Sequence, residues 1–214
     1  MNLRQPLLIV LLFSFAPSVA DADLIFDFED QQGVVGVVSL AYVKPDLTMT
    51  ITRSSGATFD VDATGATGFF NGSLSPFNGI GGASIDDVFQ FELSSPVAFI
   101  TVDAGDFGGD ADNLRLEAFT GAGLTGNSFV AQATLPGGGS NFGFVSMQLA
   151  RSPLEAGFQS FTLRGGGTQF PNSVYYDNFA FRLSAVPEPS AGIFVLVASL
   201  LGMASLRFKE QLAQ

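Results

Sequence analysis

The sequence predicts an all-β protein, a two-sheet antiparallel β-sandwich between an N-terminal signal peptide and a C-terminal transmembrane helix. Apolar and polar residues alternate along many short segments, for example at 47–52 and 89–93, and glycine-rich turn signals separate these segments. Between the two ends of the chain there is no helical periodicity. The sandwich is expected at residues 23–185, which is long enough to bury one core. With no Trp and 3 Tyr in the chain, the phenylalanines of this segment must supply most of the aromatic core.

The first segment of the chain has the parts of a secretory signal peptide. The basic residue Arg4 is followed by the apolar residues 7–16 and by a small–x–small pattern at 20–22. Signal peptidase cleaves after such a pattern. The apolar part spans about 15 Å as a helix, half of a bilayer core, so it is too short for an anchor. We expect export through the Sec-type machinery and cleavage between Ala22 and Asp23, with the bond after Ala20 as the alternative.

A second apolar segment, residues 191–206, carries no charge and lies near the C-terminus. As a helix it spans about 24 Å, slightly less than a bilayer core of about 30 Å, and snorkelling of the basic residues after it reduces the difference. Basic residues on this flank place the C-terminus in the cytoplasm. That orientation agrees with export of the middle of the chain. The two basic residues are Arg207 and Lys209.

A Pro-Glu-Pro motif directly precedes the apolar segment. Its prolines remove backbone donors and favour an extended conformation, which the cleft of a processing enzyme accepts. Motif, apolar helix and basic end, in this order at the extreme C-terminus, resemble the PEP-CTERM sorting signal. The resemblance implies recognition by an inner-membrane exosortase and processing near residues 186–190. The motif residues are Val186, Pro187, Glu188 and Pro189.

The resemblance also implies a location. It divides the chain's end, 186–214, into the motif, the helix and a basic tail at 207–214. Proteins with this signal are exported by Gram-negative bacteria that typically make exopolysaccharide. We therefore expect a transient inner-membrane anchor, followed by a place at the cell surface or outside the cell. Tails of the family often end in a tight Arg-rich cluster, whereas here Phe208 interrupts the basic pair. A plain single-span anchor is the alternative.

The last predicted strand, residues 174–183, contains Asp177 and Asn178 among aromatic residues. It is similar to the last strand of galactose-binding-like jelly rolls. Such domains commonly hold a structural calcium, which here implies Asp27, Glu29 and Asp177 as oxygen ligands. Counted back from the aromatic residues that follow it, Asp177 falls on the core side if the register is unbroken. It then requires hydrogen-bond donors, a cation or a bulge that turns it outward. Alternatively, the Asp-Asn pair caps a turn or accepts from backbone amides.

Two further expectations concern the middle of the chain. Residues 97–102 are apolar at nearly every position, which predicts a strand that is covered on both faces. The densest acidic cluster follows, with glycines that permit tight turns, but its spacing does not fit an EF-hand loop. We interpret these acids as solvated loop residues. They are Asp103, Asp106, Asp110 and Asp112.

Composition excludes several functions. The chain has no Cys and no His, so Cys/His zinc sites, thiol nucleophiles and Ser–His–Asp triads are impossible. Its formal charge of −11 argues against nucleic acid as a partner. Alternation places most carboxylates outward, and we expect no enzyme. Two functions remain: a structural or adhesive surface protein, and a calcium-stabilised module that binds exopolysaccharide. The second would use Tyr42, Tyr175, Tyr176 or loop phenylalanines as sugar platforms.

Overall fold

The computed structural model describes seven segments of the chain, and within them the protein is almost entirely β-structure, as the sequence predicts. Eleven strands form one continuous hydrogen-bonded sheet, and one short 3-10 helix, η1, follows the first strand. The strand pairs recorded between these segments are all antiparallel. The described segments are 23–61, 74–75, 88–106, 111–135, 144–152, 155–165 and 174–184.

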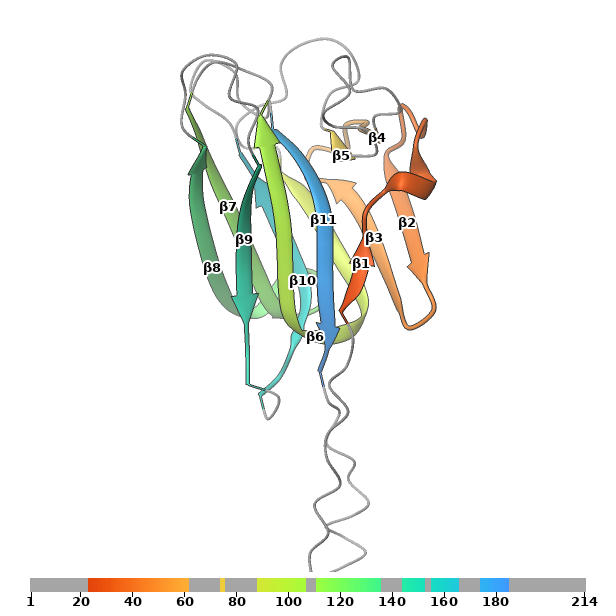
Figure 1. Ribbon diagram of the computed structural model, residues 1–214. Coiled ribbons are helices and arrows are strands. Elements are labelled where there is room, and N and C mark those ends of the chain that lie inside the picture. Colours follow the sequence, from red (N-terminus) through yellow and green to blue (C-terminus); the bar gives the residue numbers. More distant parts are fainter. Residues whose placement is uncertain are drawn as a thin grey trace, which may run out of the picture.

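The chain crosses several times between the two halves of a sandwich-like structure, so the order of strands along the chain differs from their order in the sheet (Figure 1). The elements are β1 (Leu24–Phe26), η1 (Glu29–Gln31), β2 (Ser39–Lys44), β3 (Leu47–Arg53), β4 (Asp60–Val61), β5 (Leu74–Ser75), β6 (Phe89–Asp106), β7 (Asp112–Gly121), β8 (Thr125–Leu135), β9 (Phe144–Ala150), β10 (Phe158–Arg164) and β11 (Val174–Leu183).

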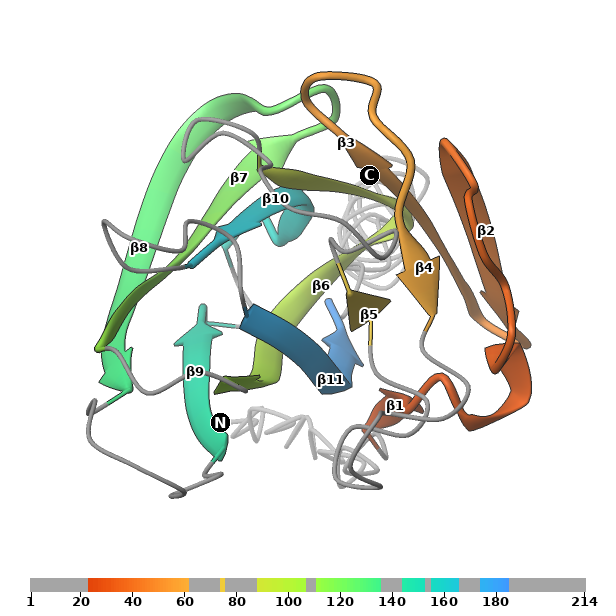
Figure 2. The ribbon, with the colours of Figure 1, turned by 90° about the horizontal axis from the view of Figure 1, so that it is seen from above.

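Strand β6 belongs to both layers of the sandwich, which Figure 2 shows from above. Its residues 89–93 pair with β3 and its residues 89–92 also with β10, whereas its residues 97–106 pair with β11 and β9. Val97, in the second part, also pairs with Phe158 of β10. The bend between the two parts contains Pro96, which has no N–H to donate to a strand partner. We call the layer of β2, β3, β10, β7 and β8 the β7 layer, and the layer of β9, β11, β1, β5 and β4 the β11 layer.

Aromatic rings fill the space between the two layers, as the sequence predicts. Phe91 of β6 stacks on Phe161 of β10, with ring centroids 4.3 Å apart and planes inclined by 3°. Both rings also meet Phe179 of the β11 layer, at 5.4 and 6.2 Å. All three side chains are inaccessible to solvent. Alternation explains this packing, because each strand sends every second side chain into the same core.

The segment 97–102 is covered completely on one face only, so the prediction of two covered faces is wrong. Val97, Ile100 and Val102 are buried, but Phe99 keeps partial exposure. Its outer side is shielded by Arg182 of the neighbouring β11, whose guanidinium carbon lies 4.9 Å from the ring centroid. A cation placed over an aromatic ring thus replaces the expected second layer of side chains.

The turn between β7 and β8 folds onto the outer face of the β7 layer. The Ser160 hydroxyl of β10 donates to the Gly121 carbonyl at 2.7 Å and accepts from the Leu124 N–H at 3.0 Å. The N–H of Gly123 donates to Glu92 at 2.8 Å. Gly121 and Gly123 lie in this turn.

Candidate functional site

The three carboxylates predicted to hold calcium lie in three places: directly after β1, in η1 and in β11. Asp27 follows β1 and accepts from the Tyr42 hydroxyl at 3.3 Å. Glu29, in η1, accepts from the side-chain amide of Gln32. Asp177, in β11, accepts from the backbone N–H of Asn178 at 2.7 Å. Within the described segments, no group of three or more acidic side chains is arranged to hold a metal ion. Calcium at these residues stays a prediction.

A bulge in β11 settles the position of Asp177. The register between β11 and β6 shifts between Asp177 and Ala180, and Asn178 has a φ of 48°, in the left-handed region. Because of the extra residue, both Tyr176 and Phe179 point into the core, and Asp177 is partly exposed. The continuous register that would have buried the carboxylate is therefore broken. A bulge and a backbone amide donor, two of the open alternatives, are what the structure contains.

The bulge joins Asp177 to a polar cluster that crosses three strands. Asp103 of β6 is the strand partner of Asp177, so two like charges lie side by side, which is unfavourable. Asp103 accepts from the side-chain amide of Asn178 at 3.2 Å and from the hydroxyl of Ser146 on β9. These donors offset the repulsion. Asp103 lies in a strand, not in a loop, so its interpretation as a solvated loop acid is wrong.

Asp112 departs further from the sequence prediction, because it is completely buried at the start of β7. Leu114 and Leu116 point into the core on the same strand. Extending that alternation by one step places Asp112 on the core face, and this signal was overlooked. Burial, together with the charge of Asp112, raises the pKa of Tyr176 above the usual range, which keeps the phenol neutral.

A second acidic corner surrounds Tyr42. Its ring packs edge-on against Phe26 at 4.8 Å, and the ammonium of Lys44 lies 5.0 Å from its centroid. Burial raises the pKa of Tyr42, and the carboxylates of Asp30 and Asp27 add to the effect. The Tyr42 hydroxyl in turn lowers the pKa of Asp30. With 1% of its surface exposed, Tyr42 offers no ring face to a sugar.

The two predicted processing boundaries flank the described sandwich. Because β1 runs antiparallel to β11, the start of β1 lies beside the end of β11, with Leu24 opposite Phe181. Asp23, the expected first residue of the mature chain, forms an ion pair with Arg182 at 2.9 Å. Residues 1–22, the motif 186–189, and the basic residues Arg207 and Lys209 lie outside the described segments.

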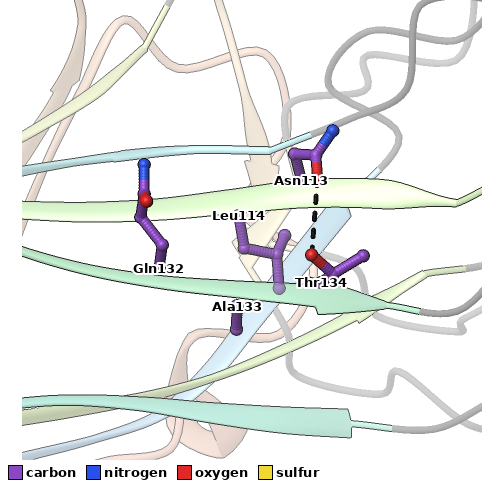
Figure 3. A pocket seen from close by; sticks show the side chains of 5 residues that line it. All are labelled: Asn113, Leu114, Gln132, Ala133 and Thr134. Atoms are coloured by element: carbon purple, nitrogen blue, oxygen red, sulfur yellow. Dashed lines mark hydrogen bonds between the residues drawn. The ribbon is translucent and has the colours of Figure 1, made fainter.

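A pocket of about 230 Å³ opens on the β7–β8 pair (Figure 3). The described residues that line it are uncharged, and Asn113 and Gln132 contribute carboxamide groups. Thr134 donates its hydroxyl to the Asn113 side-chain oxygen at 3.4 Å. Amide and hydroxyl groups can both donate and accept, so the lining suits an uncharged ligand with several hydroxyls. Leu114 and Ala133 complete the lining.

Comparison of the chain with protein-family models, curated proteins and solved structures finds no match. Within the described segments no helix has the length and apolar character needed to cross a membrane. The predicted helix at 191–206 falls outside those segments, as does the rest of the sorting signal. The resemblances to PEP-CTERM proteins and to galactose-binding-like jelly rolls therefore rest on the sequence motifs.

Proposed function

We propose that this chain is an exported, non-catalytic surface or matrix protein that is sorted through a PEP-CTERM signal and processed by an exosortase. The three-part tail at 186–214 supports the sorting step. The observation that carries the proposal furthest is the position of the two boundaries. Asp23 and Arg182 are joined at one pole of the sandwich, each within a few residues of a predicted cleavage region.

This arrangement suits a domain that is tethered twice during export. The signal peptide precedes β1 and the apolar segment 191–206 follows β11, and the adjoining ends of these two strands lie together (Figure 1). Both the signal peptide and the apolar segment 191–206 can therefore be attached at the same pole, with no linker running around the sandwich. Removing either segment leaves all described strands in place, since none of them extends beyond residues 24–183.

A tail variant tests the sorting step. In a Gram-negative host that makes the exosortase, replacing Pro187 and Pro189 by alanine is expected to leave the tail on the exported chain. Without the two proline rings, the backbone of the motif is no longer restricted to an extended conformation. Pro45→Ala, in the β2–β3 turn, is the matched control and should be processed normally. Immunoblots against a C-terminal tag measure retention. Complete removal of the tail from the double variant would refute recognition at the motif.

The pocket on β7 and β8 favours one second function, a calcium-stabilised carbohydrate-binding module. Its carboxamides and hydroxyl match the alternating donors and acceptors of a sugar, although Tyr42 and Tyr176 are too deeply buried to serve as platforms. Retention of the exported chain on an exopolysaccharide column tests this function. Gln132→Ala should reduce retention, whereas Gln148→Ala, at an exposed position of β9, should leave it unchanged. Equal retention of both variants would exclude this pocket.

Calcium is tested separately by thermal unfolding of the exported chain. An ion that binds only the folded state raises Tm, so millimolar calcium should raise it and chelator should reverse the rise. Asp177→Asn should abolish the effect if Asp177 is a ligand. A melting curve that calcium leaves unchanged would remove the metal from Asp27, Glu29 and Asp177.

A further inference from the structure

The first described residue, Asp23, is joined to the end of β11 by a compact set of contacts. Arg182 donates from both Nε and Nη2 to the Oδ1 atom of Asp23, at 3.1 and 2.9 Å, across 159 residues of chain. The same guanidinium lies over the ring of Phe99, its strand partner on β6. Arg182 therefore connects the start of β1, the end of β11 and the neighbouring strand β6.

The end of β11 leaves little free chain before the sorting motif. Leu183 pairs with Val97, and the N–H of Ser184 donates to the Pro96 carbonyl at 3.0 Å. Val186 follows only three residues after Leu183. An extended chain covers at most about 3.5 Å per residue, so the motif begins within roughly 10 Å of the folded strand. A processing enzyme that binds an extended segment must approach the sandwich closely.

We propose that Asp23 and Arg182 form a clasp that limits access to the sorting motif. This inference rests on the proposed function, and it adds regulation to the same processing site. When the clasp opens, the end of β11 can separate from β6 as far as Phe181, which is buried and held by β1. The span from the last held residue to Val186 then grows from two residue steps, counted from Ser184, to five, counted from Phe181, or to roughly 17 Å. Asp23 thus acts as a positioning residue for a cleavage site at the other end of the chain.

The effect of the clasp should be small but measurable. The side chains of Arg182 and Asp23 are 47% and 36% exposed, and exposed ion pairs change a local equilibrium by about two- to fivefold. Trypsin reports this equilibrium directly, because it cuts after Arg182 only when the end of β11 has left the sheet. The substrate is the exported chain with its tail, purified from a host that lacks the exosortase.

Asp23→Asn is expected to accelerate trypsin cleavage between Arg182 and Leu183 by about two- to fivefold. Asp46→Asn is the matched control, since it removes the same charge from an exposed position in the β2–β3 turn and should leave the rate unchanged. Mass spectrometry of the fragment that ends at Arg182 gives the rate. Equal rates for the wild type and Asp23→Asn would overturn the clasp.

A pulse–chase experiment in a host with the exosortase carries the test to processing itself. Arg182→Gln, which leaves the sequence around the signal cleavage site unchanged, should lose its tail about two- to fivefold faster than the wild type, and Arg182→Lys should fall between them. Tail removal at equal rates would overturn the regulatory role while leaving the sorting proposal intact. If the wild type keeps its tail but Asp23→Asn still speeds trypsin, the sorting proposal fails and the clasp stands.

Discussion

Strands β3 and β11, one in each layer of the sandwich, differ in the regularity of their pairing with β6. In the β7 layer, β3 alternates between buried and partly exposed residues over its whole length, from Leu47 to Arg53. In the β11 layer, the register of β11 against β6 shifts twice, once at Asp177–Ala180 and once at Arg182–Leu183. Both irregular places carry polar groups that hold specific partners. The first contains the Asp103 cluster and the second adjoins the ion pair of Asp23.

The difference shows what each of these two strands contributes. The regular strand β3 supplies one buried face to the core, whereas the irregular strand β11 also turns Asp177 outward and holds Asp23 beside Arg182. A bulge costs one unpaired residue, but it removes a carboxylate from the core, where desolvation is expensive. The polar features of the β11 layer therefore depend on local backbone geometry, and the core depends on alternation.

The largest effect is expected from the core. Phe91→Ala should reduce the free energy of unfolding by about 3–5 kcal/mol, because it leaves a cavity beside Phe161 and Phe179. Phe99→Ala, in the other part of the same strand, removes a partly exposed ring and its contact with Arg182, and should cost about 1 kcal/mol. Urea titration of both variants measures the difference. Similar losses would contradict the assignment of Phe91 to the interior.

A smaller effect should locate the irregularity at Asn178. Valine is strained at a φ of 48°, so Asn178→Val should lower stability by about 1–3 kcal/mol. Asn178→Gly removes the strain but also the amide that donates to Asp103, and should cost less. Thr50→Val in β3 is the control, with an expected change within about 0.5 kcal/mol. If valine were equally tolerated at both positions, the bulge would not have the geometry described.

The smallest effect concerns acid stability near Tyr42. The pKa of Asp30 is lowered, so the folded state binds a proton less readily than the unfolded state. The resulting stabilisation is present above the ordinary pKa of an Asp, about 3.9, and is lost as the pH falls through the lower, folded value. Tyr42→Phe removes the hydroxyl and should flatten this part of the pH–stability curve. If Tyr42→Phe leaves the slope of the free energy of unfolding against pH unchanged below about pH 5, the contact between Tyr42 and Asp30 is contradicted.

Alternation along single strands was sufficient to predict the core. Leu114 and Leu116 are buried, as are the alternate residues of 47–52 and 89–93, because in an unbroken strand parity depends only on neighbouring residues. The prediction of an all-β chain with a phenylalanine core followed from the same pattern. Composition indicated that the aromatic residues of the core would be mainly phenylalanine, since the chain has no Trp.

Features that depend on pairing between distant strands could not be predicted in the same way. The face of Asp177 changes with one extra residue, and the sequence pattern does not show where that residue is inserted. The contact of Asp103 with Ser146 and Asn178 requires three strands that are far apart in the chain. Asp112 is different. The alternation of its strand indicates the core face, but the charge of its side chain suggested solvent exposure.

The most direct test of the account is the intact mass of the mature protein from a host with both processing enzymes. We expect a chain that begins at Asp23, or at Asp21 if the alternative signal site is used, and ends within residues 186–190. Such a product would retain every described strand and both members of the ion pair. A protein that still begins with Met1 and ends with Gln214 would contradict export and sorting together.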